Sequence, residues 1–470
     1  MTRLISTVLI AVSVMTAPTL TRAAGPAYFR ADSGVASDGA ALPHDLSGTP
    51  RWKKSLDPGQ STPCVFGDSI YVTTFDAESS ELATVALDRS TGDVRWKQIA
   101  PTKEIETHHP TGSPAVSSVA CDGKRVFSFF GSFGLLCYSL DGKLLWSKPM
   151  GPFQDEFGAS SSPVLIDGKV ILNQDHDVNN FIMAVDAADG KTVWRTPREG
   201  TRSYSTPVIW NVDGKPQIVV AGSLRLTAYN PQDGSPIWWV DGLSRIVDTT
   251  PAIEGDMLFA ATWTPGGDQT KRIAMGAFAD ALEQFDKNGD KQVGKDELTP
   301  GAVLTRFFRI DLNQNQKLDE KEWNGHARVF DLAQNVAMAV KAGGRGDVTK
   351  THVKWLQRRY LPTVPSPLAF QGVVYMVKSG GILTSLDAKS GELLHQGRLE
   401  GRGNYYASPV AGDGVLYSAS EGGVVTVVKA GGELEVVSSH DFGERIMATP
   451  VAVDGQLFVR TDNAIYCFER

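Results

Sequence analysis

Eight copies of one short motif run through this chain and constrain its fold more than any other feature. Each copy is a serine or threonine, then a proline, then a short apolar run. A repeat with a period of roughly 20 to 50 residues is typical of propellers, solenoids and helical arrays. The eight anchor pairs are Thr62-Pro63, Ser113-Pro114, Ser162-Pro163, Thr206-Pro207, Thr250-Pro251, Ser366-Pro367, Ser408-Pro409 and Thr449-Pro450.

Each repeat has the pattern of a small antiparallel sheet. In the first repeat, apolar residues alternate along 69–75 and recur in short runs at 64–66, 82–88 and 94–96. Turn pairs such as Gly67-Asp68 separate these runs, and a turn pair between two alternating runs is a strong hairpin signal. The repeat therefore predicts four antiparallel strands that follow one another in the sheet.

The two ends of the chain complement each other. The last repeat stops at Arg470 after its third strand, whereas Gly48 and Trp52 have the spacing of a fourth-strand ending and precede the first anchor. An N-terminal strand that completes the last sheet closes the ring and leaves no long exposed sheet edge. We therefore predict an all-β fold, an eight-bladed β-propeller with four-stranded blades whose N-terminal strand closes the last blade. We expect the tryptophans of the outer strands to be structural and to pack on the next blade: Trp96, Trp146, Trp194 and Trp238.

The repeat resembles that of a known family. The cadence Pro-Val-x-x-x-Gly-x-Val, followed by Ala-x-Asp-x-x-x-Gly-x-x-x-Trp, is clearest between Pro163 and Trp194. It is similar to the pyrroloquinoline-quinone-type (PQQ-like) propeller repeat. That family includes quinone-dependent alcohol dehydrogenases, an outer-membrane assembly lipoprotein and many exported proteins, so the resemblance specifies the fold far more narrowly than the activity.

One interval between anchors, from Pro251 to Pro367, is more than twice as long as the others. We predict an inserted helical segment over 265–346, within the fifth repeat. Phe278, Leu282 and Phe285 share one face of a helix with a period near 3.6, and Val329, Leu332 and Val336 share another.

Two acidic loops in this insertion, 286–297 and 311–322, resemble the calcium loops of an EF-hand pair. Calcium takes six to eight oxygen ligands, and side-chain oxygens at positions 1, 3, 5 and 12 with a backbone carbonyl at position 7 wrap around one ion. Position 6 carries Lys291 and Gln316 instead of the usual glycine, which we expect to weaken affinity. The alternative is a pair of solvated acidic turns. The predicted ligands are Asp286, Asn288, Asp290, Gln292, Glu297, Asp311, Asn313, Asn315, Lys317 and Glu322.

A second candidate site lies where the segments that enter the first strands converge on the propeller axis. Aromatic and charged side chains gathered at one mouth of a channel can bind a ligand. The alternative is that these side chains only fill the axial opening. The candidate residues of this channel mouth are His108, Phe157, Tyr204, Asp248, Tyr405 and Arg445.

The N-terminal residues predict export. Arg3 precedes an apolar stretch that is too short to span a bilayer, and small residues follow, as in a secretory signal peptide. We assign 1–24 to the signal, 25–264 and 347–470 to the propeller, and expect no membrane span in the mature chain, which is then periplasmic or extracellular.

The net charge of -7 offers no positive field for nucleic acid. Cys121 and Cys137 could pair, or all four cysteines could be buried thiols.

Three functions remain open on these features. The first is a non-catalytic binding or scaffold protein that binds Ca²⁺ in the insertion and an unidentified protein or small-molecule ligand at the propeller face. The second is a PQQ-dependent oxidoreductase, although no two cysteines are adjacent, as they typically are beside the cofactor in the enzymes that the repeat resembles. An outer-membrane-assembly role is a further alternative. We find no nucleophile–base pair and name no catalytic residue.

Overall fold

The computed structural model describes residues 27–36, 39–155, 157–176, 179–265 and 275–470. The predicted signal segment, 1–24, lies outside the described residues. Within them, no helix combines the length and the apolar character needed to cross a membrane.

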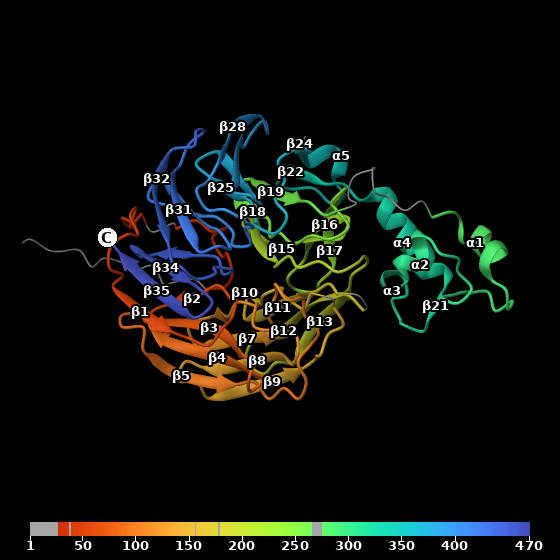
Figure 1. Cartoon of the computed structure of the whole chain (residues 1–470), viewed down its shortest axis with the longest axis horizontal. Helices are drawn as coiled ribbons and strands as arrows, with labels where there is room; N and C mark the ends of the chain where they lie inside the picture. The colour runs from red at the N-terminus through yellow and green to blue at the C-terminus, as the bar shows by residue number, and fades with distance from the viewer. Residues whose placement is uncertain (1–26, 37–38, 156, 177–178, 266–274) are drawn as a thin grey trace, which may run out of the picture.

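Eight sheets of four main strands each are arranged around a common axis, which confirms the predicted eight-bladed β-propeller (Figure 1). The first four blades are β2 (Cys64–Phe66), β3 (Ser69–Asp76), β4 (Glu81–Asp88) and β5 (Val94–Ile99); β6 (Ala120–Cys121), β7 (Arg125–Phe130), β8 (Gly134–Ser139) and β9 (Leu144–Pro149); β10 (Val164–Ile166), β11 (Lys169–Gln174), β12 (Phe181–Asp186) and β13 (Thr192–Pro197); and β14 (Val208–Val212), β15 (Lys215–Gly222), β16 (Arg225–Tyr229) and β17 (Pro236–Asp241).

The other four blades follow the same antiparallel order, and the first strands of neighbouring blades touch, so they line the axis. These blades are β18 (Ala252–Glu254), β19 (Met257–Thr262), β22 (Val336–Lys341) and β24 (Val353–Gln357); β25 (Leu368–Phe370), β26 (Val373–Lys378), β27 (Ile382–Asp387) and β28 (Leu393–Arg398); β29 (Val410–Gly412), β30 (Val415–Ala419), β31 (Val424–Lys429) and β32 (Val436–Asp441); and β33 (Val451–Val453), β34 (Gln456–Arg460) and β35 (Ala464–Glu469), with β1 (Trp52–Ser55).

The N-terminal strand is the outermost strand of the eighth blade. β1 pairs antiparallel with β35, and Trp52 lies opposite Cys467. The two ends of the chain therefore share one sheet, and the eighth blade reaches four strands like the others. The fourth blade gains a fifth, because β23 (Gly346–Asp347) pairs in parallel with β17.

A ring of buried hydroxyl groups joins the blades. In each repeat a serine or threonine stands two residues before the first strand, and in seven of the eight its hydroxyl accepts a hydrogen bond from the backbone N–H of its counterpart in the preceding blade. Because these N–H groups are buried, each would be costly to leave without a partner. Seven such bonds run through Thr62, Ser118, Ser162, Thr206, Thr250, Ser366, Ser408 and Thr449, with N···O distances of 2.9 to 3.1 Å.

The second anchor is a correction to the sequence analysis. Ser118, and not Ser113, takes the ring position in the second blade, where its hydroxyl accepts from the N–H of Thr62 at 3.0 Å. Ser118 is followed by valine, so the serine–proline pattern picks out Ser113-Pro114 five residues too early.

The Asp-x-x-x-Gly-x-x-x-Trp ending builds the outer turn of a blade. Asp186 Oδ1 accepts from the N–H of Ala188, and Gly190 takes a φ of +73° to complete the turn. The Trp146 ring of the preceding blade lies on Gly190, and its Nε1 donates to the carbonyl of Ala187 at 3.1 Å. The same indole-to-carbonyl contact is made by Trp52, Trp96, Trp194 and Trp355. Trp238 differs, because its Nε1 donates to Gln217 of its own blade.

A strap formed by residues 27–36 and 39–46 crosses the axial opening. Its first residue, Ala27, pairs with Cys121 of the second blade. Arg30 is buried, and its guanidinium donates to the carbonyls of Pro367 and Pro409, in front of the sixth and seventh blades. Val35 pairs with Ala411 in the seventh blade. The strap therefore ties opposite sides of the ring together before the chain reaches β1.

The insertion leaves the fifth blade between β19 and β22 and projects from the side of the propeller (Figure 1). Its elements are α1 (Phe278–Phe285), β20 (Val293–Gly294), α2 (Ala302–Thr305), α3 (Phe307–Ile310), β21 (Lys317–Leu318) and α4 (Glu320–Leu332). The connection from β22 to β24 holds β23, which joins the sheet of the fourth blade, and α5 (Thr349–His352). The helical part is shorter than the predicted 265–346: Val336 begins β22, because Val336 to Val340 are buried between strands as the third strand of the blade.

The cysteines are free and buried thiols. Cys121 and Cys137, which could have paired, belong to different apolar clusters on the two sides of the second blade.

Candidate functional site

Two hydrogen bonds hold the base of the insertion. The backbone N–H of Thr264 donates to Asn335 Oδ1 at 2.9 Å, and Asn335 Nδ2 donates back to the carbonyl of Thr264 at 3.1 Å. Nearby, Arg245 Nε donates to the carbonyl of Pro265. Arg245 belongs to the segment that enters β18, so the insertion leaves the propeller at the same end as the predicted channel mouth.

The first loop, 286–297, is organised by carboxylates that accept from the backbone. Asp286 Oδ1 accepts from the N–H of Gly289 at 2.7 Å, and its Oδ2 accepts from the N–H of Lys291 at 2.9 Å. Glu297, at position 12, is buried and accepts from the N–H groups of Lys287 and Gly294. A glutamate that reaches back to the start of its own loop folds the twelve residues around one centre.

The second loop, 311–322, repeats this arrangement. Asp311, which is only 2 % exposed, accepts from the N–H of Asn315 and of Gln316, and Glu322 accepts from the N–H of Asn313. Asp319 and Glu322 form a capping box at the start of α4, because each side chain accepts from the backbone N–H of the other. The last loop residue is thereby fixed at the third position of the helix.

The two loops pair through position 8. Val293 in β20 lies opposite Leu318 in β21, and both are buried in the small core of the insertion. At position 6 the backbone is left-handed, with φ of 64° at Lys291 and 66° at Gln316, the conformation for which the usual residue is glycine. The sharp turn at this position is therefore present without glycine.

The donor set of the loops suits a hard cation, and the backbone folds the ligand positions together. In the part of the chain that the structure describes, however, no three His, Cys, Asp or Glu side chains already converge as a metal cluster. The loop carboxylates instead accept from N–H groups, and Lys317 Nζ lies 2.6 Å from Asp290 Oδ2. Of the position-7 residues, Gln292 and Lys317 would supply only their backbone carbonyls.

Three of the six predicted residues, Phe157, Tyr204 and Asp248, lie close together at the channel mouth. Phe157 lies edge-on to Tyr204, with ring centroids 6.2 Å apart, and the Tyr204 hydroxyl donates to Asp155 Oδ1 at 2.7 Å. His109 stacks on Phe157 at 5.0 Å, and the Arg202 guanidinium lies 5.5 Å from the centre of the same ring.

Two acidic side chains at the channel mouth, Asp248 and Glu106, have raised pKa values. Burial, and then the charge of Asp155, raises the pKa of Asp248 to about 7, although Arg245 and Arg202 oppose this effect. Burial raises the pKa of Glu106 to about 8, again with a contribution from Asp155, while a hydrogen bond from the backbone N–H of Ala159 opposes the shift. Acidic groups that are crowded and partly desolvated hold their protons to higher pH than in water.

The other predicted mouth residues make different contacts. His108 turns towards Phe75 of the first blade, and its Nδ1 lies 3.3 Å from the carbonyl of Glu106. Tyr405 is buried between the sixth and seventh blades, where its hydroxyl donates to the carbonyl of Gly401. Arg445 pairs with Asp462 at 2.8 Å.

Sequence reasoning missed the two acids on which this electrostatics depends, Glu106 and Asp155. Both lie in the segments that enter first strands, beside residues that were chosen. Their place in these entering segments is the one sequence signal by which they could have been predicted.

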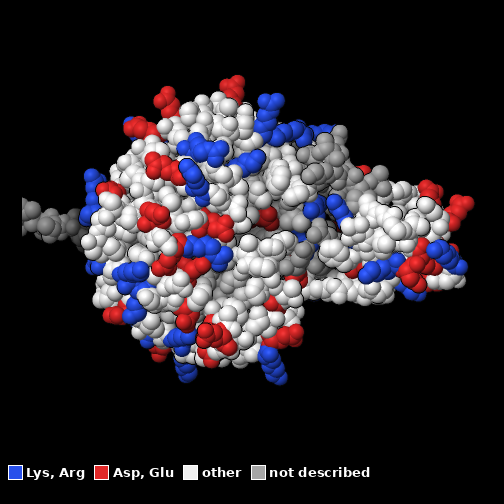
Figure 2. Space-filling view, in the orientation of Figure 1, with Lys and Arg blue, Asp and Glu red and all other residues white. Residues whose placement is uncertain are grey.

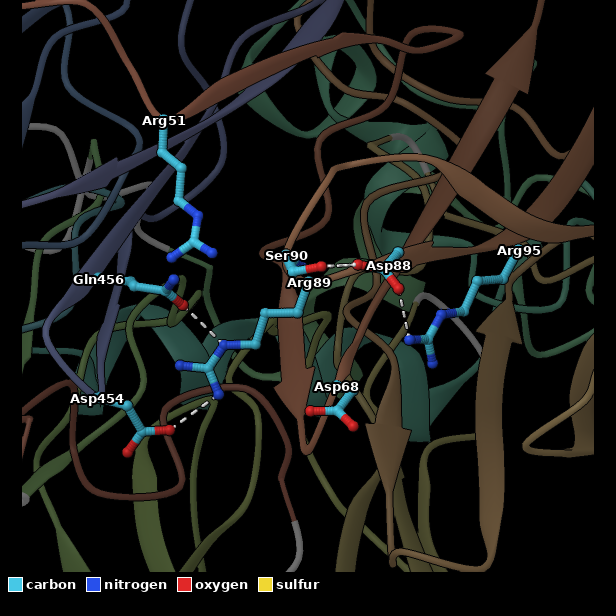
Figure 3. Close-up of a pocket in the computed structure, with 8 residues that line it drawn as sticks. All are labelled: Arg51, Asp68, Asp88, Arg89, Ser90, Arg95, Asp454 and Gln456. Atoms are coloured by element: carbon cyan, nitrogen blue, oxygen red, sulfur yellow. Dashed lines mark hydrogen bonds and ion pairs between the residues drawn. The ribbon is translucent and has the colours of Figure 1, made fainter.

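A polar cleft of about 360 Å³ lies at the seam where the ring closes (Figure 3). Arg89 stands at its centre and bonds Gln456 and Asp454 of the eighth blade at 2.8 Å each. Arg95 pairs with Asp88 at 2.7 Å, and Arg51 pairs with Glu469. Of these three arginines, Arg89 joins the first blade to the eighth, so its two bonds reinforce the closing of the ring. Over the face seen in Figure 2, acidic and basic side chains are interspersed rather than segregated.

Eight blades, the serine or threonine ring and the docked tryptophans define this chain as a PQQ-like propeller. It belongs to the family described as outer membrane protein assembly factor BamB, whose profile matches residues 16–179, 178–292 and 339–470. No curated protein matches it in a sequence comparison.

Among solved structures, the chain is similar to BamB from Moraxella catarrhalis, with a TM-score of 0.55 and 12 % identity over 90 % of this chain and 99 % of that one. It is also similar to a europium-containing methanol dehydrogenase, with a TM-score of 0.55 and 10 % identity over 91 % and 95 %. The computationally designed Ika8 protein matches with a TM-score of 0.54 and 11 % identity over 90 % and 100 %. These likenesses concern the fold.

Proposed function

We propose that this protein is an exported, calcium-binding PQQ-like propeller that acts as a non-catalytic binding or scaffold protein. The observation that carries the calcium part is the pairing of two twelve-residue loops through position 8, each with an acidic residue at positions 1 and 12. One solvated acidic turn is common, whereas two loops bridged in register at the same position are the arrangement that EF-hand pairs use.

The ligands divide evenly between the loops. In the first, Asp286, Asn288, Asp290 and Glu297 would offer side-chain oxygens and Gln292 its carbonyl. Glu297 and Glu322 can each supply two oxygens. In the second loop the corresponding residues are Asp311, Asn313, Asn315, Glu322 and, through its carbonyl, Lys317. A bound Ca²⁺ would neutralise the buried carboxylates and hold each loop closed around the ion.

The place of the insertion supports a scaffold role. It leaves the propeller beside the channel mouth. A partner that contacts this end of the ring would therefore meet both the insertion and the aromatic side chains of Phe157 and Tyr204. Calcium would then stiffen a recognition element rather than take part in chemistry. Membership of the BamB family is consistent with a role in protein interaction, and the partner stays unidentified.

Isothermal titration calorimetry tests the calcium proposal. We expect the wild-type protein to take up calcium at its two loops, and the double variant Asp286→Ala, Asp311→Ala to give no calcium heat. The matched control is Asp296→Ala with Glu320→Ala, which removes the same charge from non-ligand positions of the same loops and should bind as wild type does. A wild-type protein that gives no heat would refute the proposal.

A PQQ-dependent oxidoreductase is the second candidate, favoured by the fold that the chain shares with the methanol dehydrogenase. Reconstitution with PQQ, followed by absorbance and dye reduction, decides between the two functions. A stoichiometric bound quinone with dye reduction would displace the scaffold proposal. An assembly role, the third candidate, predicts that cross-linking in the cell envelope captures outer-membrane assembly partners.

A further inference from the structure

The charged side chain of Lys317 contacts Asp290, one of the residues expected to bind calcium in the first loop. Lys317 belongs to the second loop, but its Nζ lies 2.6 Å from Asp290 Oδ2 in the first loop. The bridge between the loops causes this crossing, because Lys317 lies opposite Gly294 in the β20–β21 pair. Both side chains are partly exposed, so the contact forms at the open side of the loop.

We propose that Lys317 is a tethered competitor for the first loop and determines its calcium affinity. This inference rests on the proposed calcium function. The Asp290 carboxylate cannot keep the ammonium group at hydrogen-bond distance and also receive a divalent ion close by, because the two cations repel each other. Calcium must therefore displace the Lys317 side chain before Asp290 can serve as a ligand.

The same residue has a different relation to the second loop. There Lys317 stands at position 7, which contributes a backbone carbonyl, so the identity of its side chain matters little for that loop. One residue would thus set the affinity of one loop through its ammonium group and serve the other loop through its main chain. In the metal-free protein the ammonium group also offsets the negative charge of Asp290 in the first loop.

Two opposite changes should follow from Lys317→Gln. Calcium binding at the first loop should tighten about two- to fivefold, since a competitor of the strength of an exposed ion pair is removed. The metal-free protein should melt at a lower temperature, because the acidic loop loses its internal cation. A lysine that only packs against the loop would produce the second change without the first.

The experiment isolates each loop by titration calorimetry on the full chain. With Asp311→Ala, or Asp311→Asn if alanine reduces the helical circular dichroism, only the first loop binds, and adding Lys317→Gln should tighten binding. With Asp286→Ala only the second loop binds, and Lys317→Gln should change its affinity less than about twofold. The control Lys321→Gln removes the same charge from the second loop, away from Asp290, and should leave the first loop unchanged.

The outcomes separate this inference from the proposed function. Equal first-loop affinities with and without Lys317→Gln, or an equal gain from Lys321→Gln, overturn the competitor role while calcium binding stands. Absence of calcium heat in both the wild-type protein and Lys317→Gln overturns the proposed function and the inference together.

Discussion

Docking of the tryptophans on the next blade can be tested with two glycines of the same blade. Gly190 and Gly168 have nearly the same backbone conformation, with φ of +73° and +70°. A Cβ at Gly190 would lie 2.7 Å from Cε3 of Trp146, whereas a Cβ at Gly168 meets nothing within 4 Å. Alanine therefore introduces the same backbone strain at both positions and a steric clash at only one.

The difference between the two variants measures the docking contact. Left-handed backbone at alanine costs about 1–2 kcal/mol in each variant. Displacing the Trp146 ring should cost about 1–3 kcal/mol more in Gly190→Ala. Urea unfolding followed by circular dichroism should therefore rank wild type above Gly168→Ala, and Gly168→Ala above Gly190→Ala. Equal losses in the two variants would refute the idea that the indole fixes the position of the next blade.

Three further predictions follow from buried polar groups. Thr206→Val should destabilise the fold by about 1–3 kcal/mol in urea unfolding, because the buried N–H of Ser162 loses its acceptor, while Thr206→Ser should retain most of the stability. Glu106 and Asp248 have raised pKa values, so the folded state binds their protons more tightly than the unfolded chain, and the stability they contribute should fall as the pH rises from about 5 to 8. Asp248→Asn should flatten that pH dependence, and an unchanged slope would contradict it. Arg30→Met should expose the strap to limited proteolysis, and an unaltered cleavage rate would show that the strap is held by other contacts.

The propeller could be predicted from the sequence because each repeat carries the same residues for the same local contacts. Hydroxyl groups before first strands, glycine at the outer turn and tryptophan four residues later each report a contact that every blade repeats. The second blade shows the limit of this reasoning. Ser118 keeps the contact without the proline, and only the hydrogen bond from Thr62 reveals it.

The candidate sites were less predictable, because they depend on side chains that meet across blades and loops. The acidic pattern of the loops is local and could be read directly. Glu106 and Asp155 are brought together by the ring and carry no motif of their own. The crossing of Lys317 to Asp290 follows from the register of two short strands, which the spacing of acidic residues does not specify.

Native mass spectrometry of the full chain, purified in calcium, counts the bound ions directly. We expect a mass increase equal to two calcium ions for each chain, which disappears in the Asp286→Ala, Asp311→Ala variant. A chain that carries no calcium under these conditions, or that keeps both ions in the variant, would contradict it.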